Sequence, residues 1–416
     1  MKSRLSLEGG VPLKGTVRSS GAKNAALPIL AGCILTHGDS VIHNVPDLMD
    51  IKTMIKMLEA LGLKTDYRSN GTLRVSSTQK IRHIAPYELV TAMRASFFVA
   101  GPVLAKTGLA KIPLPGGCAI GSRPIDLHLK GFEALGATTE IQHGFVVMKA
   151  KKLVGTQIYL DFPSVGATEN IMMAACLAEG KTVIENAALE PEITDLGEFL
   201  NSAGARISGL RTNKITIEGV SQINNTEYTV IPDRIEVGTL MIAAAITLGD
   251  IVVEGIRMEH QEPLIQKLRD CGAVVEIGDD TIRVSATERV RAVDIKTMPF
   301  PGFPTDMQAQ FLALLTVANG TSVVTETIFE NRFMHAQELI RMGAKIKIEQ
   351  NHVTITGVEQ LSGADVKITD LRAGAALILA GLAADGFTTV HGLHHLNRGY
   401  ENLPAKIRSL GGRISG

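Results

Sequence analysis

The chain has 416 residues, 45% of them hydrophobic and 20% charged, which excludes a disordered or collagen-like protein and suits two or three folded domains. Its 42 basic and 42 acidic residues cancel, so no field over the whole protein would attract nucleic acid or a membrane surface. Four scattered cysteines without a CxxC pair favour a reducing compartment over a disulfide framework or a zinc site. With no signal peptide and no apolar run of the ~20 residues that span a bilayer, we expect a cytoplasmic protein with no membrane partner.

Residues 1–20 read as two strands, SRLSLEG and KGTVRS, and the rest of the chain is built of repeats. A short motif of an apolar or small residue, a glycine and a strand occurs six times, with the glycines at positions 62, 136, 204, 272, 343 and 411. The intervals between these glycines are 74, 68, 68, 71 and 68 residues, so one repeat has about 70 residues.

The third repeat shows most clearly which elements to expect. GATENIMMAACLAEG predicts a helix closed by Gly180, KTVIENA a strand, EITDLGEFLNSAGA an amphipathic helix, and RISGL and KITIEGV two further strands. The first helix of each repeat is apolar nearly all round, as in TAMRASFFVAGPVLAKTG of the second. Such helices are normally buried on every side, so we expect them inside, walled by sheets and amphipathic helices.

Six repeats exceed a single core and predict two domains of three repeats each. Domain one is expected at residues 21–230, and domain two at residues 1–20 plus 231–416, where the N-terminal strands complete the last repeat. Domain one contains an irregular loop at 112–127. A cleft between the domains is the expected binding site.

Several of the buried helices begin with charged or amide side chains: Lys23 and Asn24, Arg94, Asp306 after Pro304, and Arg372 after Asp370. A cation in the first turn of a helix opposes the helix dipole at a cost of ~0.3–1 kcal/mol. One interpretation is that these long side chains bend into solvent. The other is that the helix starts together trap a phosphate or a carboxylate.

The loop IPLPGGCAIGSRPIDL interrupts the second repeat with three prolines and three glycines and predicts a mobile surface segment. Gly116 and Gly117 allow a ligand to approach the backbone near Cys118, and Arg123 could lower the pKa of the thiol or bind an anion. Without a His/Asp partner at protease spacing, Cys118 fits an acid better than an acyl-transfer nucleophile. A small buried hydrophobe is the alternative, and the one we prefer for Cys33, Cys176 and Cys271.

Nine motifs together identify a family: SGAKNAALP (20–28), MRAS (93–96), LPGGCAIGSRPIDLH (114–128), SVGAT (164–168), PDRIE (232–236), FPTDMQAQ (303–310), ENRFMH (330–335), TDLRA (369–373) and RGYE (398–401). From end to end the chain closely resembles the UDP-N-acetylglucosamine 1-carboxyvinyltransferases, enolpyruvyl transferases of peptidoglycan synthesis. The resemblance implies an α/β fold of two inside-out α/β barrels. It also implies transfer of the enolpyruvyl group of phosphoenolpyruvate to the 3'-OH of UDP-N-acetylglucosamine, with release of phosphate and without metal or cofactor.

The resemblance also implies roles for single residues. Lys23, Arg123 and Arg398 would hold phosphoenolpyruvate, with Asn24, Arg94, Asp370 and Arg372 near the substrates. Contacts to UDP-N-acetylglucosamine would come from Arg123, Pro124, Ile125, Asp126, Leu127, Ser164, Val165, Asp306 and the backbone around Ile328. Cys118 would protonate C3 of the enolpyruvyl group and is the position that fosfomycin alkylates in this family. Asp306 would take the proton from the sugar hydroxyl. Some members have a lysine two residues before Ser164, where this chain has Phe162, which weakens the assignments of Ser164 and Val165.

Three alternatives remain open. A shikimate 3-phosphate substrate would use the same fold, but that relative lacks the motif around Cys118. The six repeats could form a clamp or scaffold without catalysis, although zero net charge and 4% aromatic residues argue against one that binds nucleic acid. The chain could also be a second, less active copy of the enzyme in its genome.

Overall fold

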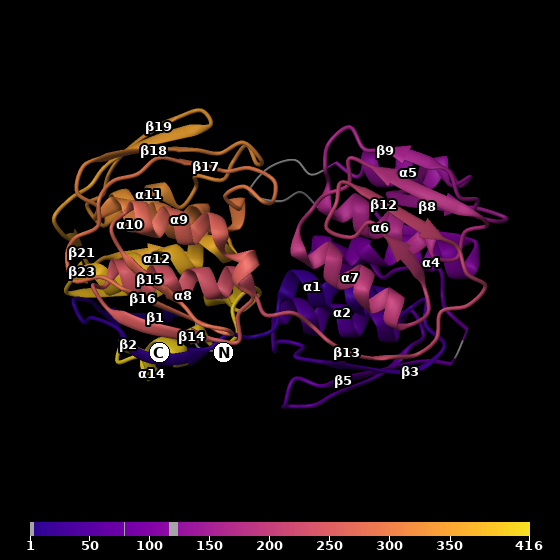
Figure 1. The fold of residues 1–416 in the computed structure, drawn as a ribbon, viewed down its shortest axis with the longest axis horizontal. Helices are drawn as coiled ribbons and strands as arrows, with labels where there is room; N and C mark the ends of the chain where they lie inside the picture. Colours follow the sequence, from indigo (N-terminus) through magenta and orange to yellow (C-terminus); the bar gives the residue numbers. More distant parts are fainter. Residues whose placement is uncertain (1–3, 79, 116–123) are drawn as a thin grey trace. The chain divides into compact units, whose positions relative to one another are not determined.

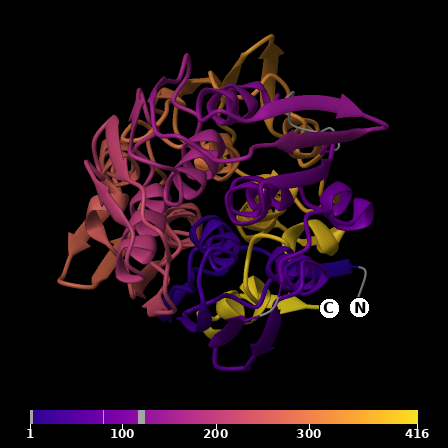
Figure 2. The same ribbon diagram turned by 90° about the vertical axis from the view of Figure 1, so that its right-hand side faces the viewer.

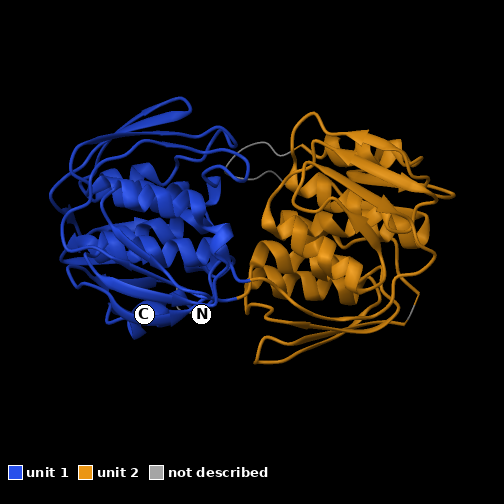
Figure 3. Ribbon diagram, in the orientation of Figure 1, with its two compact units in different colours: residues 1–20, 119–122, 232–416 blue, residues 21–118, 123–231 orange. Residues whose placement is uncertain are grey.

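The computed structural model describes residues 4–78, 80–115 and 124–416, which fall into two compact units (Figure 3). One unit contains the described residues up to Ser20 together with Pro232–Gly416, and the other contains the described residues of 21–231. Each unit has a separate hydrophobic core.

The unit of residues 21–231 has three repeats of helix and sheet (Figure 1). Its helices are α1 (Lys23–Gly32), α2 (Met49–Ala60), α3 (Tyr87–Ala92), the 3₁₀ helix η1 (Arg94–Val99), α4 (Ala100–Thr107), α5 (Asp126–Ala134), α6 (Val165–Ala175) and α7 (Pro191–Ser202). Its strands are β3 (Gly38–His43), β4 (Lys64–Tyr67), β5 (Leu73–Ser77), β6 (Leu109–Pro113), β7 (Thr138–Gln142), β8 (Phe145–Lys149), β9 (Gln157–Tyr159), β10 (Lys181–Glu185), β11 (Arg206–Ser208), β12 (Lys214–Glu218) and β13 (Glu227–Thr229). They form sheets in the orders β13-β3-β5-β4, β6-β8-β7 and β11-β12-β10-β9.

The other unit also has three repeats. Its helices are α8 (Arg234–Ile246), η2 (Met258–His260), α9 (Glu262–Asp270), η3 (Thr305–Met307), α10 (Gln308–Thr316), α11 (Ala336–Arg341), α12 (Leu371–Ala383), α13 (Leu393–Leu396) and α14 (Leu403–Ser409). Its strands are β1 (Arg4–Glu8), β2 (Lys14–Arg18), β14 (Asp250–Glu254), β15 (Val274–Ile277), β16 (Thr281–Ser285), β17 (Ile295–Lys296), β18 (Thr321–Thr325), β19 (Lys345–Glu349), β20 (His352–Thr356), β21 (Leu361–Ser362), β22 (Asp365–Lys367), β23 (Ala384–Asp385), β24 (Phe387–His391) and β25 (Arg413–Ser415). The sheets have the orders β22-β24-β1-β25, β15-β16-β14-β2, β17-β18-β20-β19 and β21-β23.

Each repeat places one helix inside and one sheet outside, as the sequence predicts. Nearly every residue of α1, α6, α8, α10 and α12 is buried. Figure 2 shows the helices of the nearer unit almost end-on, with its strands outside them. Helices without a polar face can be stable in water only in such an enclosed position, and the predicted α/β fold class is confirmed.

The recurring glycine closes the outer helix of each repeat. At all six positions its φ is positive, between 92° and 104°, which a side chain would make unfavourable. The backbone turns there into the strand that follows. The glycine motif that recurs in the sequence therefore marks the same turn in each repeat.

The N-terminal strands differ from the prediction that both complete the last repeat. β1 does so, because it pairs antiparallel with β24 and β25. β2 instead pairs in parallel with β14, in the sheet of the fourth repeat. Two strands joined by a short loop thus enter two different sheets.

The predicted first helix of the second repeat is divided in three. Met93 is extended (φ −144°, ψ 113°), which ends α3, and the chain continues as η1 and then α4. Pro102 lies in the first turn of α4, where its missing N–H removes no helical hydrogen bond. Arg94 is therefore the first residue of a 3₁₀ helix.

Candidate active site

Asp306 lies between two arginines in the unit that contains α8–α14. Its Oδ1 accepts a hydrogen bond from Arg332 Nη2 and its Oδ2 accepts one from Arg372 Nη2, both at 2.9 Å. The arginine side chains are 3% and 2% exposed, whereas the carboxylate is 26% exposed. Two buried cations thus hold one carboxylate that solvent can still reach.

Arg372 is held at the start of α12 by the residues around it. Asp370 Oδ1 accepts hydrogen bonds from the backbone N–H groups of Arg372 and Ala373, so it caps the helix. Burial alone would lower the pKa of Arg372, but neighbouring acidic groups, chiefly Asp306, raise it above its ordinary value. The interpretation that this side chain bends into solvent is wrong, since a carboxylate of the protein itself neutralises it. Its Nε and Nη1 are buried without a hydrogen-bond partner among the described residues.

Glu326 connects the turn of Asp306 to the loop of Ile328. Its buried carboxylate accepts from Thr305 Oγ1 at 2.9 Å and from Ile328 N at 2.8 Å. Thr297 Oγ1 donates to the same carboxylate at 2.8 Å. Because its N–H is engaged with Glu326, Ile328 can offer a ligand its carbonyl oxygen but not its N–H.

In the other unit, Lys23 is the first residue of α1 and is only 7% exposed. Its Nζ lies 3.3 Å from Oδ2 of Asp50, in the first turn of α2. The side chain does not extend into solvent, contrary to one of the two interpretations of its position. Asn24 follows it and is half-buried.

The start of α6 brings together Ser164, Val165 and a buried histidine. Ser164 caps the helix by accepting from Ala167 N at 3.3 Å. A Cβ added to Gly166 would lie 3.2 Å from the ring of His128, so only a glycine lets the imidazole come this close. Burial and the charge of Arg94 lower the pKa of His128 to about 3, and the ring is neutral. Since Asn170 Nδ2 lies 3.1 Å from His128 Nδ1, the proton is on Nε2.

The loop predicted at 112–127 is described only in part. Cys118 and Arg123 lie outside the described residues. Pro124 and Ile125 precede α5, and Asp126 and Leu127 are its first residues.

Near α5, Phe162 is 48% exposed, and its neighbour Asp161 pairs with Lys130 Nζ at 2.6 Å. The position at which the resemblance implies a lysine in some members is thus occupied by an exposed hydrophobic side chain beside an exposed ion pair.

Arg94 and Arg398 are both half-buried. Arg94 begins η1 in the unit of residues 21–231. Arg398 follows α13 in the other unit, and its charge contributes to the lowered pKa of His395, after burial and His394.

The other three cysteines are buried, as predicted. Burial raises the pKa of Cys33, Cys176 and Cys271 to about 12, so their thiols stay protonated near neutral pH.

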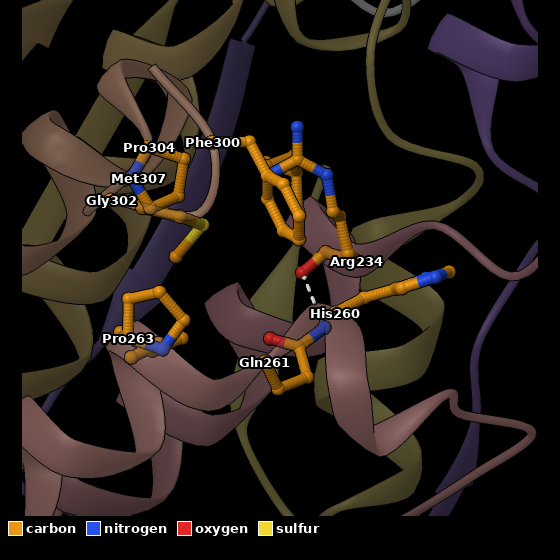
Figure 4. Close-up of a pocket in the computed structure, with 10 residues that line it drawn as sticks. Arg234, His260, Gln261, Pro263, Phe300, Gly302, Pro304 and Met307 are labelled. Carbon is orange, nitrogen blue, oxygen red and sulfur yellow. Dashed lines mark hydrogen bonds between the residues drawn. The ribbon is translucent and has the colours of Figure 1, made fainter. Parts of the chain in front are cut away.

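A small pocket lies beside the turn of Asp306 (Figure 4). The guanidinium of Arg234 lies over the ring of Phe300, 5.8 Å from its centre, and Gln261 Nε2 donates to the carbonyl oxygen of Arg234. Pro304 and Met307, which flank Asp306, form part of the wall. No predicted site residue lines this pocket, so we place the candidate site at Asp306 and not here.

In residues 4–78, 80–115 and 124–416, no three His, Cys, Asp or Glu side chains are grouped so that they could hold a metal ion. No helix in this part of the chain is long and apolar enough to cross a membrane.

Comparison with known proteins identifies the relatives of this chain. The family described as EPSP synthase (3-phosphoshikimate 1-carboxyvinyltransferase) matches residues 7–407. UDP-N-acetylglucosamine 1-carboxyvinyltransferase 1 of Caldanaerobacter subterraneus subsp. tengcongensis is 55% identical over 414 residues, covering 100% of this chain and 99% of the relative. UDP-N-acetylglucosamine 1-carboxyvinyltransferase 2 of Carboxydothermus hydrogenoformans is 57% identical over 410 residues, 98% of each.

Solved structures give the same result for the fold. The enolpyruvyl transferase NikO from Streptomyces tendae superposes with a TM-score of 0.90 at 26% identity, covering 100% of this chain and 99% of that one. An EPSP synthase from Acinetobacter baumannii superposes with a TM-score of 0.78 at 17% identity, covering all of both chains. The fold is that of the enolpyruvyl transferases. The chain belongs to the family of the UDP-N-acetylglucosamine 1-carboxyvinyltransferases, as its motifs indicate.

Several residues at the candidate site were not predicted from the sequence: Arg332, Glu326, His128, Gln310 and Tyr400. Arg332 lies within the motif ENRFMH, and Gln310 and Tyr400 lie within FPTDMQAQ and RGYE. The motifs could therefore have located these three, but nothing in their local sequence indicates which side chain each would meet.

Proposed function

We propose that this chain transfers the enolpyruvyl group of phosphoenolpyruvate to the 3'-OH of UDP-N-acetylglucosamine in peptidoglycan synthesis, in the cytoplasm. Its relatives of 51–57% identity over nearly the full chain have that activity in their names. The observation in the structure that supports the proposal best is the partly exposed carboxylate of Asp306 between Arg332 and Arg372.

Asp306 is the proposed general base. Each carboxylate oxygen accepts a hydrogen bond from one arginine, and the side chain is 26% exposed, so the sugar hydroxyl can reach it. The two arginines balance the negative charge of the carboxylate before it takes the proton. They also stabilise negative charge that develops beside it.

Arg372 is a proposed binding group for the carboxylate or phosphate of phosphoenolpyruvate. Its buried Nε and Nη1 are donors whose desolvation costs free energy until an acceptor arrives, and an anion supplies two acceptors in the matching geometry. Lys23, Arg123 and Arg398 supply the remaining positive charge in this proposal, and Asn24 and Arg94 complete the polar surroundings. Such a cationic set binds phosphoenolpyruvate without a metal ion.

The nucleotide sugar is assigned to helix starts and backbone groups. The first turn of α6, with Ser164 and Val165, directs N–H groups outward and suits the diphosphate. The segment from Pro124 to Leu127 and the carbonyl oxygen of Ile328 supply further contacts in the proposal.

The reaction proceeds in two steps. Cys118 gives a proton to C3 of phosphoenolpyruvate, which makes C2 electrophilic, and the 3'-oxygen adds to C2 as its proton passes to Asp306. In the second step C3 loses a proton, the C2–C3 double bond re-forms, and the C2–O bond to phosphate breaks. Acid and base must therefore stand at opposite ends of one bond.

Phosphate release tests the function. The purified chain is incubated with phosphoenolpyruvate alone, with UDP-N-acetylglucosamine, or with shikimate 3-phosphate. Release that requires UDP-N-acetylglucosamine, with a product heavier by one enolpyruvyl group in mass spectrometry, supports the proposal. Release only with shikimate 3-phosphate, or with neither acceptor, contradicts it.

A further inference from the structure

Asp306 and three residues around it form a closed circuit of contacts. Gln310 Nε2 donates to the backbone carbonyl oxygen of Asp306 and to Tyr400 Oη, both at 2.9 Å. The ring of Tyr400 lies under the Arg372 guanidinium, 5.4 Å from ring centre to Cζ. Arg372 Nη2 then returns to Asp306 Oδ2 at 2.9 Å. We call Asp306, Gln310, Tyr400 and Arg372 the Tyr400 circuit.

The hydrogen bonds around Tyr400 have one consistent direction. Thr239 Oγ1 donates to the carbonyl oxygen of Ile235 at 2.8 Å, so its only proton is used. Tyr400 Oη, 2.9 Å away, must therefore donate to Thr239 Oγ1, and it accepts from Gln310. Burial raises the pKa of Tyr400, although the charge of Arg372 opposes this, so the hydroxyl keeps the proton that it donates. Gln310 Nε2 also lies 3.3 Å from Thr239 Oγ1, and Gln310 Oε1 is buried without a hydrogen-bond partner among the described residues.

The Tyr400 circuit connects elements that are distant in the sequence. Asp306 lies in η3, Gln310 in α10, Arg372 in α12, and Tyr400 in the segment between α13 and α14. Helices α8, α10 and α12 pack against one another, and Thr239 of α8 anchors Tyr400 from outside the circuit. Two routes of contact thus join Tyr400 to Asp306, through Gln310 to its backbone and through Arg372 to its carboxylate.

We propose that Tyr400 is a positioning residue for the reaction: its hydroxyl, through Gln310, fixes the turn that directs the Asp306 carboxylate, and its ring holds the Arg372 guanidinium in place for the anionic substrate. This proposal rests on the proposed function. Tyr400 itself contacts no reacting atom in this assignment. A base and an anion-binding group that share one support keep a constant separation, which proton transfer and substrate orientation both require.

Two variants of Tyr400 separate its hydroxyl from its ring. Tyr400→Phe keeps the ring over Arg372 but removes the acceptor of Gln310. We expect kcat to fall roughly 10- to 100-fold, with both KM values within about twofold, because a small misplacement of a catalytic group affects the chemical step. Tyr400→Leu also removes the ring, so we expect an additional rise in KM for phosphoenolpyruvate.

Thr239→Val is the matched control. It removes a buried hydroxyl that contacts Tyr400 Oη at 2.9 Å and Gln310 Nε2 at 3.3 Å, but it leaves the contacts among the four residues of the circuit. If Tyr400 only stabilises the fold, Tyr400→Phe and Thr239→Val will lower the melting temperature and kcat to a similar extent. We expect similar melting temperatures but a loss of kcat in Tyr400→Phe alone. Gln310→Met should reduce kcat at least as much, and the double variant with Tyr400→Phe should be little worse, because both break one circuit.

The outcomes separate this inference from the proposed function. A wild-type chain that releases no phosphate in the presence of UDP-N-acetylglucosamine overturns the proposed function and, with it, the inference. An active wild-type chain in which Tyr400→Phe and Thr239→Val have equal kcat overturns the inference alone.

Discussion

Lys406 and Glu236 form an ion pair whose carboxylate is almost fully buried. Lys406 Nζ lies 2.8 Å from Glu236 Oε1, and the two side chains are 17% and 2% exposed. Both partners also bind Ser20, whose N–H donates to Glu236 Oε2 and whose hydroxyl accepts from Lys406, each at 2.6 Å. The pair thus ties α8 and α14 to the end of the N-terminal segment that enters this unit.

Lys406→Met is expected to destabilise the unit strongly. Burial raises the pKa of Glu236 and Lys406 opposes this rise, so removing the lysine leaves a buried carboxylate without its cation. Breaking such a pair costs about 3–5 kcal/mol. The loss should be smaller at pH 5 than at pH 8, because at low pH the carboxyl can take up a proton. Thermal unfolding at both pH values measures this, with exposed Lys345→Met as control. Equal melting temperatures of wild type and Lys406→Met would contradict the expectation.

The buried carboxyl of Glu169 predicts a second pH dependence of the stability, in this case in the wild-type chain. Its carboxyl is fully buried without a hydrogen-bond partner among the described residues, and burial raises its pKa well above 4.5, with Glu192 and Glu190 adding to the rise. In the unfolded chain the group ionises near 4.5, so above that pH the native state holds a proton that the unfolded state has lost. Stability then falls with rising pH by up to about 1.4 kcal/mol per pH unit until the native pKa is reached.

Glu169→Gln, which cannot ionise, should be more stable than wild type, and the difference should grow from pH 5 to pH 8. Urea unfolding at several pH values gives this difference directly. Glu218→Gln, at an exposed position of β12, is the control and should show no such trend. A Glu169→Gln variant whose gain is constant across the range would mean that Glu169 is ionised in the native state.

How far the sequence predicts the fold is clear from single elements. The glycines that end the outer helices, such as Gly204 and Gly272, are local features, and they locate the repeats because only a turn of positive φ needs them. The pairing of β2 with β14 was not predictable from local sequence, because it depends on which sheet edge is open once the repeats have packed. The break at Met93 has no glycine or proline at its site and was missed for the same reason.

The residues of the candidate site were also predicted only where the signal lies in the local sequence. Lys23 and Arg372 were predicted because a cation at the start of an apolar helix is anomalous in the sequence alone. Asp50 was not predicted, and Asp306 was predicted as a site residue but not as the partner of Arg372, since ion pairing at these positions depends on tertiary structure. Arg332 comes from the turn before α11 and meets Asp306 only in the folded unit. Local sequence therefore indicates which cations need an anionic partner, but not which carboxylate of the protein pairs with each of them.

Asp306→Asn tests the proposed base. The amide keeps the shape but cannot accept the proton, so turnover should fall by about 10²–10⁴-fold while the affinity for UDP-N-acetylglucosamine decreases modestly. Phosphate release gives kcat, and isothermal titration gives the affinity. Asp385→Asn, at an exposed position of the same unit, is the control. Near wild-type turnover of Asp306→Asn would make the carboxylate a binding group only.

Cys118 is expected to be the one cysteine that reacts with an electrophile. Cys33, Cys176 and Cys271 are buried, and the rise of their pKa to about 12 leaves almost no thiolate at pH 7.5, whereas Arg123 is expected to favour the thiolate of Cys118. Fosfomycin should therefore give a single adduct, located on Cys118 by peptide mass spectrometry, and faster with UDP-N-acetylglucosamine present. Cys118→Asp should abolish the adduct yet keep appreciable turnover, because a carboxylic acid can also donate the proton, while Cys118→Ala should lose most activity. An adduct on one of the buried cysteines, or a fully active Cys118→Ala enzyme, would remove Cys118 from the mechanism.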